Sequence, residues 1–390
     1  MMIANETERR IAILQTTLVN RGIGALVAFA NGTREGAGTV RYLTGWMPFN
    51  SEVFLVVPAK GRAVVVSADK NRARAFRMRF GAEGEVVKTT DLYGSLQEVL
   101  SRLVPAGTVV AYTGDADFTV KQSAEFFALL SEYDRLDGNA IVNVQRLERT
   151  PYEAGKHRKA TEIADKLVAH AMGIASVKGI TGAEIMAEVE YLGRRLGADS
   201  SSCWLAIGER PPETYFELFE LVEPVGPHSR VQIGTTVCLD GYYSQVLRMG
   251  MFSEPSPELQ STSAAIIQMQ DAALAKMVPG TPVHELVDVL EEMIDAHCPY
   301  TRTTDPFRFQ SIHGMGNSYS EPGVAPFLNA GRDKSLDAGS PLVREHMVFE
   351  VHPNFTMPEL GHVCHGDTAV VGKNGGAWLS KTPRGIYRLS

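Results

Sequence analysis

The chain has 390 residues, which is more than one ordinary hydrophobic core accommodates and predicts two domains. Hydrophobic residues make up 44% and charged residues 21%, and no apolar run approaches the roughly 18 residues that span a bilayer, so we expect no membrane partner. The net charge of -7 is spread along the chain without a basic patch that could neutralise phosphates, so we expect no nucleic-acid partner.

The cysteines and the N-terminal segment predict a cytoplasmic protein. The four cysteines lie far apart and form no Cys-x-x-Cys pair, which is typical of reduced thiols and not of a disulfide framework or a zinc knuckle. The segment 1–18 is charged and amphipathic, and it lacks the apolar centre of a secretory signal peptide.

Helix and strand patterns alternate over the first part of the chain and predict an α/β domain over residues 1–148. A helix is expected over 6–22, where apolar residues form one stripe that ends at Gly22. We find no catalytic cluster and no glycine-rich phosphate loop in this domain. The further predicted elements are strands at 25–29, 52–57, 62–68 and 108–114 and a helix at 120–133.

A change in composition at 146–152 marks the start of a second domain, which we expect over residues 149–390. Pro151 stands where a long amphipathic helix begins, a position at which the missing N–H of proline costs little.

The second domain contains a faint internal duplication. Two pairs of helical segments each have a loop between the helices, and Gly179 and Glu184 in the first pair match Gly280 and Glu285 in the second at one constant offset. Each pair shows one apolar helix face and is followed by strands. We therefore predict two similar α–α–β halves around a pseudo-twofold axis, with the functional site between them.

Several motifs in fixed order resemble the creatinase/prolidase/aminopeptidase P family over nearly the whole chain. They are the turn RYLTG (41–45), the junction 146–166, MVPGTPVHEL (277–286), HGMGNSYSEP (313–322), MVFEVHP (347–353) and GHVCHGDTAVVGKNG (361–375). The resemblance implies an α/β fold with an N-terminal creatinase-like α/β domain, followed by a C-terminal pita-bread α+β domain. It also implies a homodimer in which the region of Trp46 and Phe49 closes the cleft of the other subunit.

In the metallopeptidase members of that family, two Asp, one His and two Glu hold two divalent metal ions, and the resemblance assigns their positions here. His313 matches the His. His352 and Gly366 stand at the two Glu positions, and Gln245 stands at the second Asp position.

The first Asp position has two candidates. Counting back from Gln245 without a gap gives Gly234, whereas matching the strand TTVCLD gives Asp240. Either way at most two of the five ligands remain, so we expect no cofactor and no two-metal centre. The alternative is a single metal ion held by His313, His352 and Glu350.

The remaining chemistry depends on histidines. Glu350 lies two residues before His352 on one strand and therefore shares its face. Imidazole titrates near neutral pH, so we expect His313 and His352, oriented by Glu350, to be the catalytic proton-transfer residues. The substrate-binding candidates are His228, which matches a proline–histidine segment that lies over the site in relatives, and Asp240, Tyr242, Gln245, Arg248, Glu321, His362 and His365.

These residues lead us to expect a metal-independent, creatinase-like hydrolase that cleaves the C–N bond of a small molecule other than a peptide. Creatine itself is not expected, because Leu247 and His352 stand where creatinase would carry carboxylates, so a neutral or anionic substrate is favoured. The alternatives are a lyase on the same fold, a non-catalytic binding module and a metal-dependent Xaa-Pro peptidase. The residues do not identify the substrate.

Overall fold

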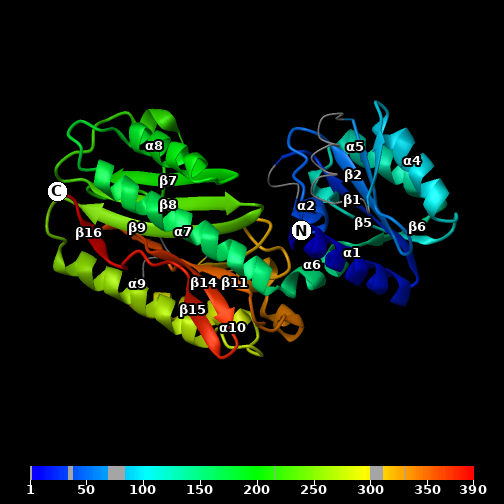
Figure 1. Ribbon diagram of the computed structural model, residues 1–390. Coiled ribbons are helices and arrows are strands. Elements are labelled where there is room, and N and C mark those ends of the chain that lie inside the picture. The colour runs from blue at the N-terminus through cyan, green and yellow to red at the C-terminus, as the bar shows by residue number, and fades with distance from the viewer. Residues whose placement is uncertain (1, 34–37, 69–83, 216, 299–310, 330) are drawn as a thin grey trace. The chain divides into compact units, whose positions relative to one another are not determined.

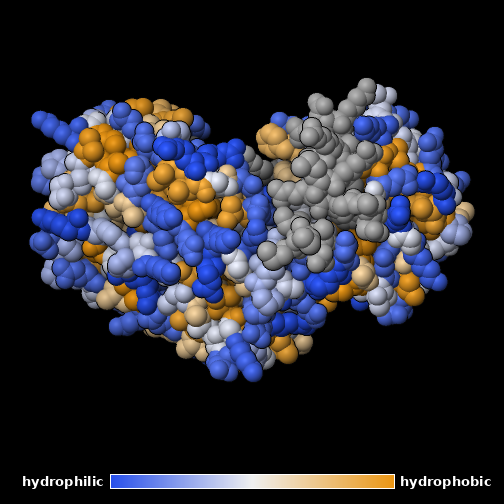
Figure 2. Space-filling view, viewed as in Figure 1, coloured by the Kyte–Doolittle hydropathy of each residue, from blue (hydrophilic) through white to orange (hydrophobic). Residues whose placement is uncertain are grey.

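A computed structural model describes residues 2–33, 38–68, 84–215, 217–298, 311–329 and 331–390. The chain divides into two compact units, Met1–Leu147 and Glu148–Ser390. Within the described residues, no helix is long and apolar enough to cross a membrane. On the face seen in Figure 2, hydrophilic side chains cover most of the described surface, and hydrophobic groups are scattered among them.

The N-terminal unit is an α/β domain built on a six-stranded sheet of order β4-β3-β2-β1-β5-β6 (Figure 1). Its strands are β1 (Ile23–Ala30), β2 (Val53–Pro58), β3 (Val64–Ser67), β4 (Glu85–Lys88), β5 (Val109–Thr113) and β6 (Asp134–Asp137). Its helices are α1 (Met2–Asn20), α2 (Gly38–Thr44), α4 (Leu92–Leu103), η2 (Asp115–Asp117), α5 (Val120–Leu129), η3 (Leu130–Glu132) and α6 (Asn139–Leu147).

The predicted strands of this unit form where β-branched residues gather, because such residues fit a pleated, buried surface. Every residue of β2 is buried, and so is every residue of β3. The segment RYLTG was expected as a turn and is instead the end of α2, where Gly45 follows at a positive φ of 64°. Its apolar residues are buried on a helix face, which a short motif could not distinguish from a turn.

The C-terminal unit is built on an eight-stranded sheet whose main order is β10-β11-β14-β9-β8-β7, with β15 paired to β14 and β16 to β9. The strands are β7 (Ser200–Gly208), β8 (Arg230–Leu239), β9 (Tyr242–Met251), β10 (Ile312–Met315), β11 (Val348–Val351), β14 (Gly366–Gly372), β15 (Gly375–Trp378) and β16 (Ile386–Arg388). A separate hairpin joins β12 (Phe355–Met357) and β13 (Gly361–Val363). The helices are α7 (Pro151–Ile174), α8 (Gly182–Arg195), η4 (Leu218–Leu221), α9 (Pro257–Lys276), α10 (His284–His297), α12 (Ala325–Leu328) and η5 (Lys334–Gly339).

The predicted duplication is visible in the loops that precede α8 and α10. Gly179 and Gly280 both have positive φ, 84° and 99°, as a side chain-free residue in a tight turn permits. Isolated β-bridges then join Thr181 to Pro224 in the first half and Pro282 to Leu342 in the second. Helices α7 and α8 pack on β7, β8 and β9, whereas α9 and α10 lie along the half that contains β14 and β15 (Figure 1).

Local capping explains where α7 begins. Thr150 is the N-cap, its hydroxyl accepts from the backbone of Glu153, and the carboxylate of Glu153 accepts from the backbone of Thr150. Pro151 follows in the first turn, as expected from the sequence. The β8–β9 hairpin packs against this helix and turns at Asp240 and Gly241, both at positive φ.

Candidate functional site

A small cavity of about 30 Å³ opens within the C-terminal unit, over the middle of the β7–β8–β9 sheet. Strands β7, β8 and β9 supply its floor, and the segment that runs from His352 to Cys364 supplies a wall. Its lining residues are Trp204, Glu213, Gln232, Ile233, Gly234, Gln245, Leu247, His352, Asn354, His362 and Cys364.

The two candidates for the first Asp position lie in different places. Gly234 lines the cavity and pairs across the hairpin with Leu247. Asp240 is in the hairpin turn, where it pairs with Lys156 and is absent from the cavity lining. The geometry therefore favours Gly234 as the equivalent position, and Asp240 has a structural contact instead of the substrate contact that we expected.

Leu247 and Glu350 fill the space beside the two glycines. A Cβ atom at position 366 would lie 2.5 Å from Leu247 Cδ1 and 2.7 Å from Glu350 Oε1. A Cβ atom at position 234 would lie 3.1 Å from Leu247 Cγ. The side chain of Leu247 thus lies between Gly234 and Gly366, in the volume that side chains at those positions would need.

His313 and His352 come together as the sequence suggested. Their rings are in edge contact with centroids 5.1 Å apart, and the ring of Tyr319 lies 4.6 Å from that of His313. Tyr319 also donates a hydrogen bond of 2.9 Å to Oε1 of Gln245 and stacks on Trp204. These five side chains form one continuous cluster at the cavity.

Burial decides the charge state of this cluster. It lowers the pKa of His313 to about 4, and it lowers the pKa of His352 well below its usual value, with the neighbouring His313 as the next cause. Both imidazoles are therefore neutral at pH 7. Burial also raises the pKa of Glu350 well above its ordinary range, which favours the uncharged acid.

Glu350 is not among the residues that line the cavity, and a chain of hydroxyl groups holds its carboxyl group. Its Oε2 atom is 2.8 Å from the hydroxyl of Thr368, which is 2.9 Å from the hydroxyl of Ser244, which is in turn 2.7 Å from the hydroxyl of Thr161. The other oxygen, Oε1, has no hydrogen-bond partner among the described residues. This chain of hydroxyls fixes the carboxyl group next to Gly366.

Of the two histidines near β14 that we expected to bind substrate, one lines the cavity and the other does not. His362 lines the cavity, and its Nδ1 atom is 3.1 Å from the hydroxyl of Thr356. His365 instead contacts the hydroxyl of Ser263 on α9 at 2.7 Å and is absent from the lining. Burial lowers the pKa of each to about 3.

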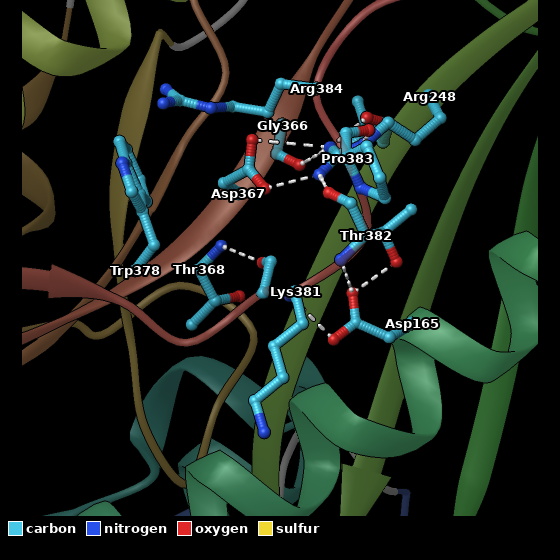
Figure 3. A network of polar contacts seen from close by, with 12 residues as sticks. Asp165, Arg248, Gly366, Asp367, Thr368, Trp378, Lys381, Thr382, Pro383 and Arg384 are labelled. Atoms are coloured by element: carbon cyan, nitrogen blue, oxygen red, sulfur yellow. Dashed lines mark hydrogen bonds and ion pairs between the residues drawn. The ribbon is translucent and has the colours of Figure 1, made fainter. Parts of the chain in front are cut away.

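Arg248 is bound within the protein and does not face the cavity (Figure 3). Its side chain is 0% exposed and donates to both carboxylate oxygens of Asp367 and to backbone carbonyls, as Figure 3 shows. The carbonyl acceptors belong to Leu247, Gly366, Thr382 and Pro383. Each of its guanidinium nitrogens is therefore engaged within the protein, which leaves the expected contact with a substrate without a free donor.

Three further candidates also lie outside the cavity lining. Glu321 is buried in an ion pair with Arg149, with 2.5 Å between the charged groups, and its carboxylate packs against Gly316. Tyr242 is buried with its ring against those of His157 and Tyr152. His228 lies exposed in the turn before β8.

The sequence reasoning missed several lining residues. Trp204 alternates with Cys203 along β7, so the indole faces the cavity while the thiol faces the hydrophobic core. Burial raises the pKa of the Cys203 thiol far above its usual range, so this cysteine is not an activated nucleophile. Asn354 and Glu213 were also missed. An aromatic residue in a strand beside the site was the available signal for Trp204.

The model for metallopeptidase family M24 matches residues 155–373, more than half of the chain. The chain belongs to this family. Its curated relatives include a putative dipeptidase of Bacillus subtilis, 26% identical over 64% of this chain and 64% of the relative. Another is the Xaa-Pro dipeptidase of Pyrococcus furiosus, 25% identical over 70% of this chain and 73% of the relative. The alignments thus span about two thirds of the length of these relatives.

Solved structures agree on the fold. A prolidase from Thermococcus sibiricus superposes with a TM-score of 0.78 at 19% identity, covering 98% of this chain and 99% of the other. A dipeptidase from Mycobacterium ulcerans gives 0.79 at 19% identity, covering 99% and 98%. The expected fold, an N-terminal α/β domain and a C-terminal pita-bread domain, is confirmed.

The relatives also correct two expectations. We expected a metal-independent enzyme that acts on a small molecule other than a peptide, without a cofactor. The family is one of metallopeptidases, and several curated relatives are named Xaa-Pro dipeptidase, so both expectations are wrong and the peptidase alternative is better supported. The error came from giving a few replaced ligands more weight than the likeness of the whole domain. The coarser expectation, a hydrolase of carbon–nitrogen bonds, agrees with this family.

The residues of this chain nevertheless do not fit the family's two-metal centre. Gly234 and Gly366 offer no side-chain donor, and Oε1 of Gln245 already accepts the hydrogen bond of Tyr319. Leu247 and Glu350 fill the adjoining space. We therefore derive no catalytic step through such a centre. Among the described residues, a possible metal-binding group lies elsewhere, at His284, Asp288 and Asp337, where Arg332 already pairs with both carboxylates.

Proposed function

We propose that this protein is a peptidase that binds short peptides in the cavity of its C-terminal unit and hydrolyses a peptide C–N bond, with Xaa-Pro dipeptides as the substrate class. One observation carries the proposal. The cavity is lined by Gly234, Gln245 and His352, three of the positions that the resemblance assigns to the family's site, within the segment that matches the family model. The names of the curated relatives supply the substrate class.

The side chains present suit an uncharged peptide group. Oδ1 of Asn354 is buried and accepts no hydrogen bond from the described residues, so a peptide N–H can donate to it. The neutral imidazole of His352 and the amide of Gln245 face the same cavity. Trp204 and Leu247 add apolar surface on which a proline ring can pack. We propose that His313 and His352 adjoin the bond that is cleaved.

The test is hydrolysis of Leu-Pro and Ala-Pro, with Leu-Ala for comparison, followed by chromatography of the released amino acids. The assay is run after chelation and again with Mn²⁺, Co²⁺ or Zn²⁺ added, because the donor set does not match the family's metal centre. We expect release of proline, and we expect His352→Gln to reduce it at least tenfold while the circular dichroism spectrum is retained. No release under any metal condition would reject the peptidase.

A second candidate is binding of peptides without cleavage. It is favoured by one observation, the filling of the space beside Gly234 and Gly366 by Leu247 and Glu350. Calorimetry with the same dipeptides distinguishes the two: binding without release of amino acids supports this candidate, and hydrolysis eliminates it.

We also propose that the protein is a cytoplasmic homodimer. The four cysteines are all free thiols and all buried, which suits a reducing compartment. The dimer rests on the family resemblance. Sedimentation equilibrium measures the mass directly, and a monomer at micromolar concentration would contradict it.

A further inference from the structure

Tyr319 connects the two halves of the C-terminal unit beside the cavity. It follows β10, which belongs to the second half, and its hydroxyl donates to Oε1 of Gln245 in β9, in the first half, at 2.9 Å. Its ring packs against that of His313, with centroids 4.6 Å apart, and stacks on that of Trp204, with centroids 6.3 Å apart. The phenol is therefore held in one orientation, with its hydroxyl directed at Gln245.

The loop that carries Tyr319 is anchored to the β8–β9 hairpin. The carbonyl of Gly316 accepts from the backbone N–H of Tyr243 at 3.1 Å. The side-chain amide of Asn317 donates to the carbonyl of Gly241 at 3.2 Å. Because both bonds reach the same hairpin, the hydroxyl of Tyr319 is presented to that hairpin from a fixed backbone.

The hydrogen bond from Tyr319 decides which end of the Gln245 amide faces the cavity. Burial raises the pKa of Tyr319 above its usual range, so the hydroxyl keeps its proton and donates it to Oε1. Gln245 is 3% exposed and lines the cavity, and its Nε2 atom has no hydrogen-bond partner among the described residues. With Oε1 held by the phenol, the N–H₂ group is the end that remains for a ligand.

The other glutamine of the lining is engaged at both ends. Nε2 of Gln232 donates to the carbonyl of Pro212 at 3.0 Å, and its Oε1 lies 3.8 Å from the thiol of Cys364. Asn354, in contrast, has a buried Oδ1 atom that accepts no hydrogen bond within the described part of the chain. The lining thus offers a ligand a donor at Gln245 and an acceptor at Asn354.

The size and charge of the cavity indicate which ligand group meets this donor. A volume of about 30 Å³ holds only one or two groups of the size of a water molecule, so the group that enters is small. No Lys or Arg is among the described lining residues, so a buried carboxylate would find no positive charge there. A neutral carbonyl oxygen satisfies both conditions.

We propose that Tyr319 is a positioning residue that orients the amide of Gln245, so that Nε2 donates to the carbonyl oxygen of the peptide bond held beside His313. The assignment rests on the proposed function for the peptide itself. It adds a role for Gln245, which stands at the second Asp position of the family: here the side chain is a hydrogen-bond donor to the substrate.

The experiment is calorimetric binding to the full chain, after chelation, of Leu-Pro and of its thioamide analogue, in which sulfur replaces the carbonyl oxygen of the peptide bond. Tyr319→Phe keeps the ring and removes the hydroxyl. We expect this variant to bind Leu-Pro about fivefold more weakly, the scale of one neutral hydrogen bond. The thioamide should bind equally to the variant and to the unaltered protein, because sulfur is a weak acceptor.

Tyr215→Phe is the matched control. Its hydroxyl donates to the carbonyl of Ile207 at 3.0 Å, and Tyr215 is not among the lining residues. This variant should bind Leu-Pro as the unaltered protein does.

Gln245→Leu distinguishes positioning from a general effect on the structure. If the phenol acts through the amide, adding Tyr319→Phe to Gln245→Leu should weaken Leu-Pro binding no further. Losses that add up in the double variant would overturn the inference. Circular dichroism of each variant verifies the fold.

The outcomes also separate this inference from the peptidase. A loss in Tyr319→Phe that is confined to Leu-Pro supports the inference even where no amino acid is released. Release of proline together with equal affinity of Tyr319→Phe and the unaltered protein for Leu-Pro would leave the peptidase standing and overturn the inference, and so would an equal loss for Leu-Pro and the thioamide. Binding of neither ligand by the unaltered protein at millimolar concentration would overturn both.

Discussion

Gly366 stands at one of the two Glu positions of the family's metal site, and it has no room for a side chain. We predict that Gly366→Ala costs about 1–3 kcal/mol of stability, because the new methyl group would meet Leu247 and the carboxyl group of Glu350 at less than van der Waals distance. Urea unfolding of the full chain measures the loss.

Gly173→Ala is the control for that substitution. Gly173 lies in α7 with open space around it, so alanine there should raise stability by roughly 0.5–1 kcal/mol through its higher helix propensity. If Gly366→Ala proved as stable as the unaltered chain, Leu247 and Glu350 would have to move freely, and the description of a filled site would be incorrect.

The residues of the site differ in how far the sequence could place them. Strand alternation put Glu350 and His352 in one neighbourhood, and the loop motif added His313. The filling by Leu247 was not predictable in the same way, because it depends on which residues lie opposite in the hairpin and on which strand adds to it. Glu213 comes from an irregular segment, for which no periodicity exists to be read.

At the scale of elements, the two halves of the C-terminal unit differ in how their second helix is capped. Helix α8 begins with a full capping box between Thr181 and Glu184, whereas α10 begins without a side-chain cap. We predict that Thr181→Ala destabilises the chain by about 1 kcal/mol, since it exposes backbone N–H groups of the first turn, and that Thr181→Ser costs only a fraction of this. Hydrogen exchange of α8 amides reports the change locally, and equal exchange in both variants would argue against the cap.

The elements themselves were easier to predict than their ends. Long amphipathic helices such as α7 carry their own start signals, a cap and a proline. The short α2 has no such start signals. Its motif was interpreted as a turn, because so short a buried segment can form either a turn or a single helical turn.

At the scale of the whole molecule, buried neutral histidines make stability depend on pH. Burial, with the charge of Arg149 as the second cause, lowers the pKa of His157 from 6.5 to about 3. Four more histidines shift in the same direction, namely His313, His352, His362 and His365. The unfolded chain binds protons on these groups at a higher pH than the folded chain does. Their contribution to stability is therefore complete above pH 6.5 and is lost as the pH falls from 6.5 toward about 3.

His157→Gln tests this dependence, because it removes one such group that is not among the residues lining the cavity. The variant loses the contact between Nδ1 and the carbonyl of Tyr243, so it should be less stable at neutral pH. Its stability should, however, fall less steeply below pH 6.5, by up to about 1.4 kcal/mol per pH unit. Urea unfolding across this range, followed by hydrogen exchange of β9, gives both slopes. Parallel curves for His157→Gln and the unaltered chain would mean that His157 takes up its proton in the folded state as readily as in the unfolded one.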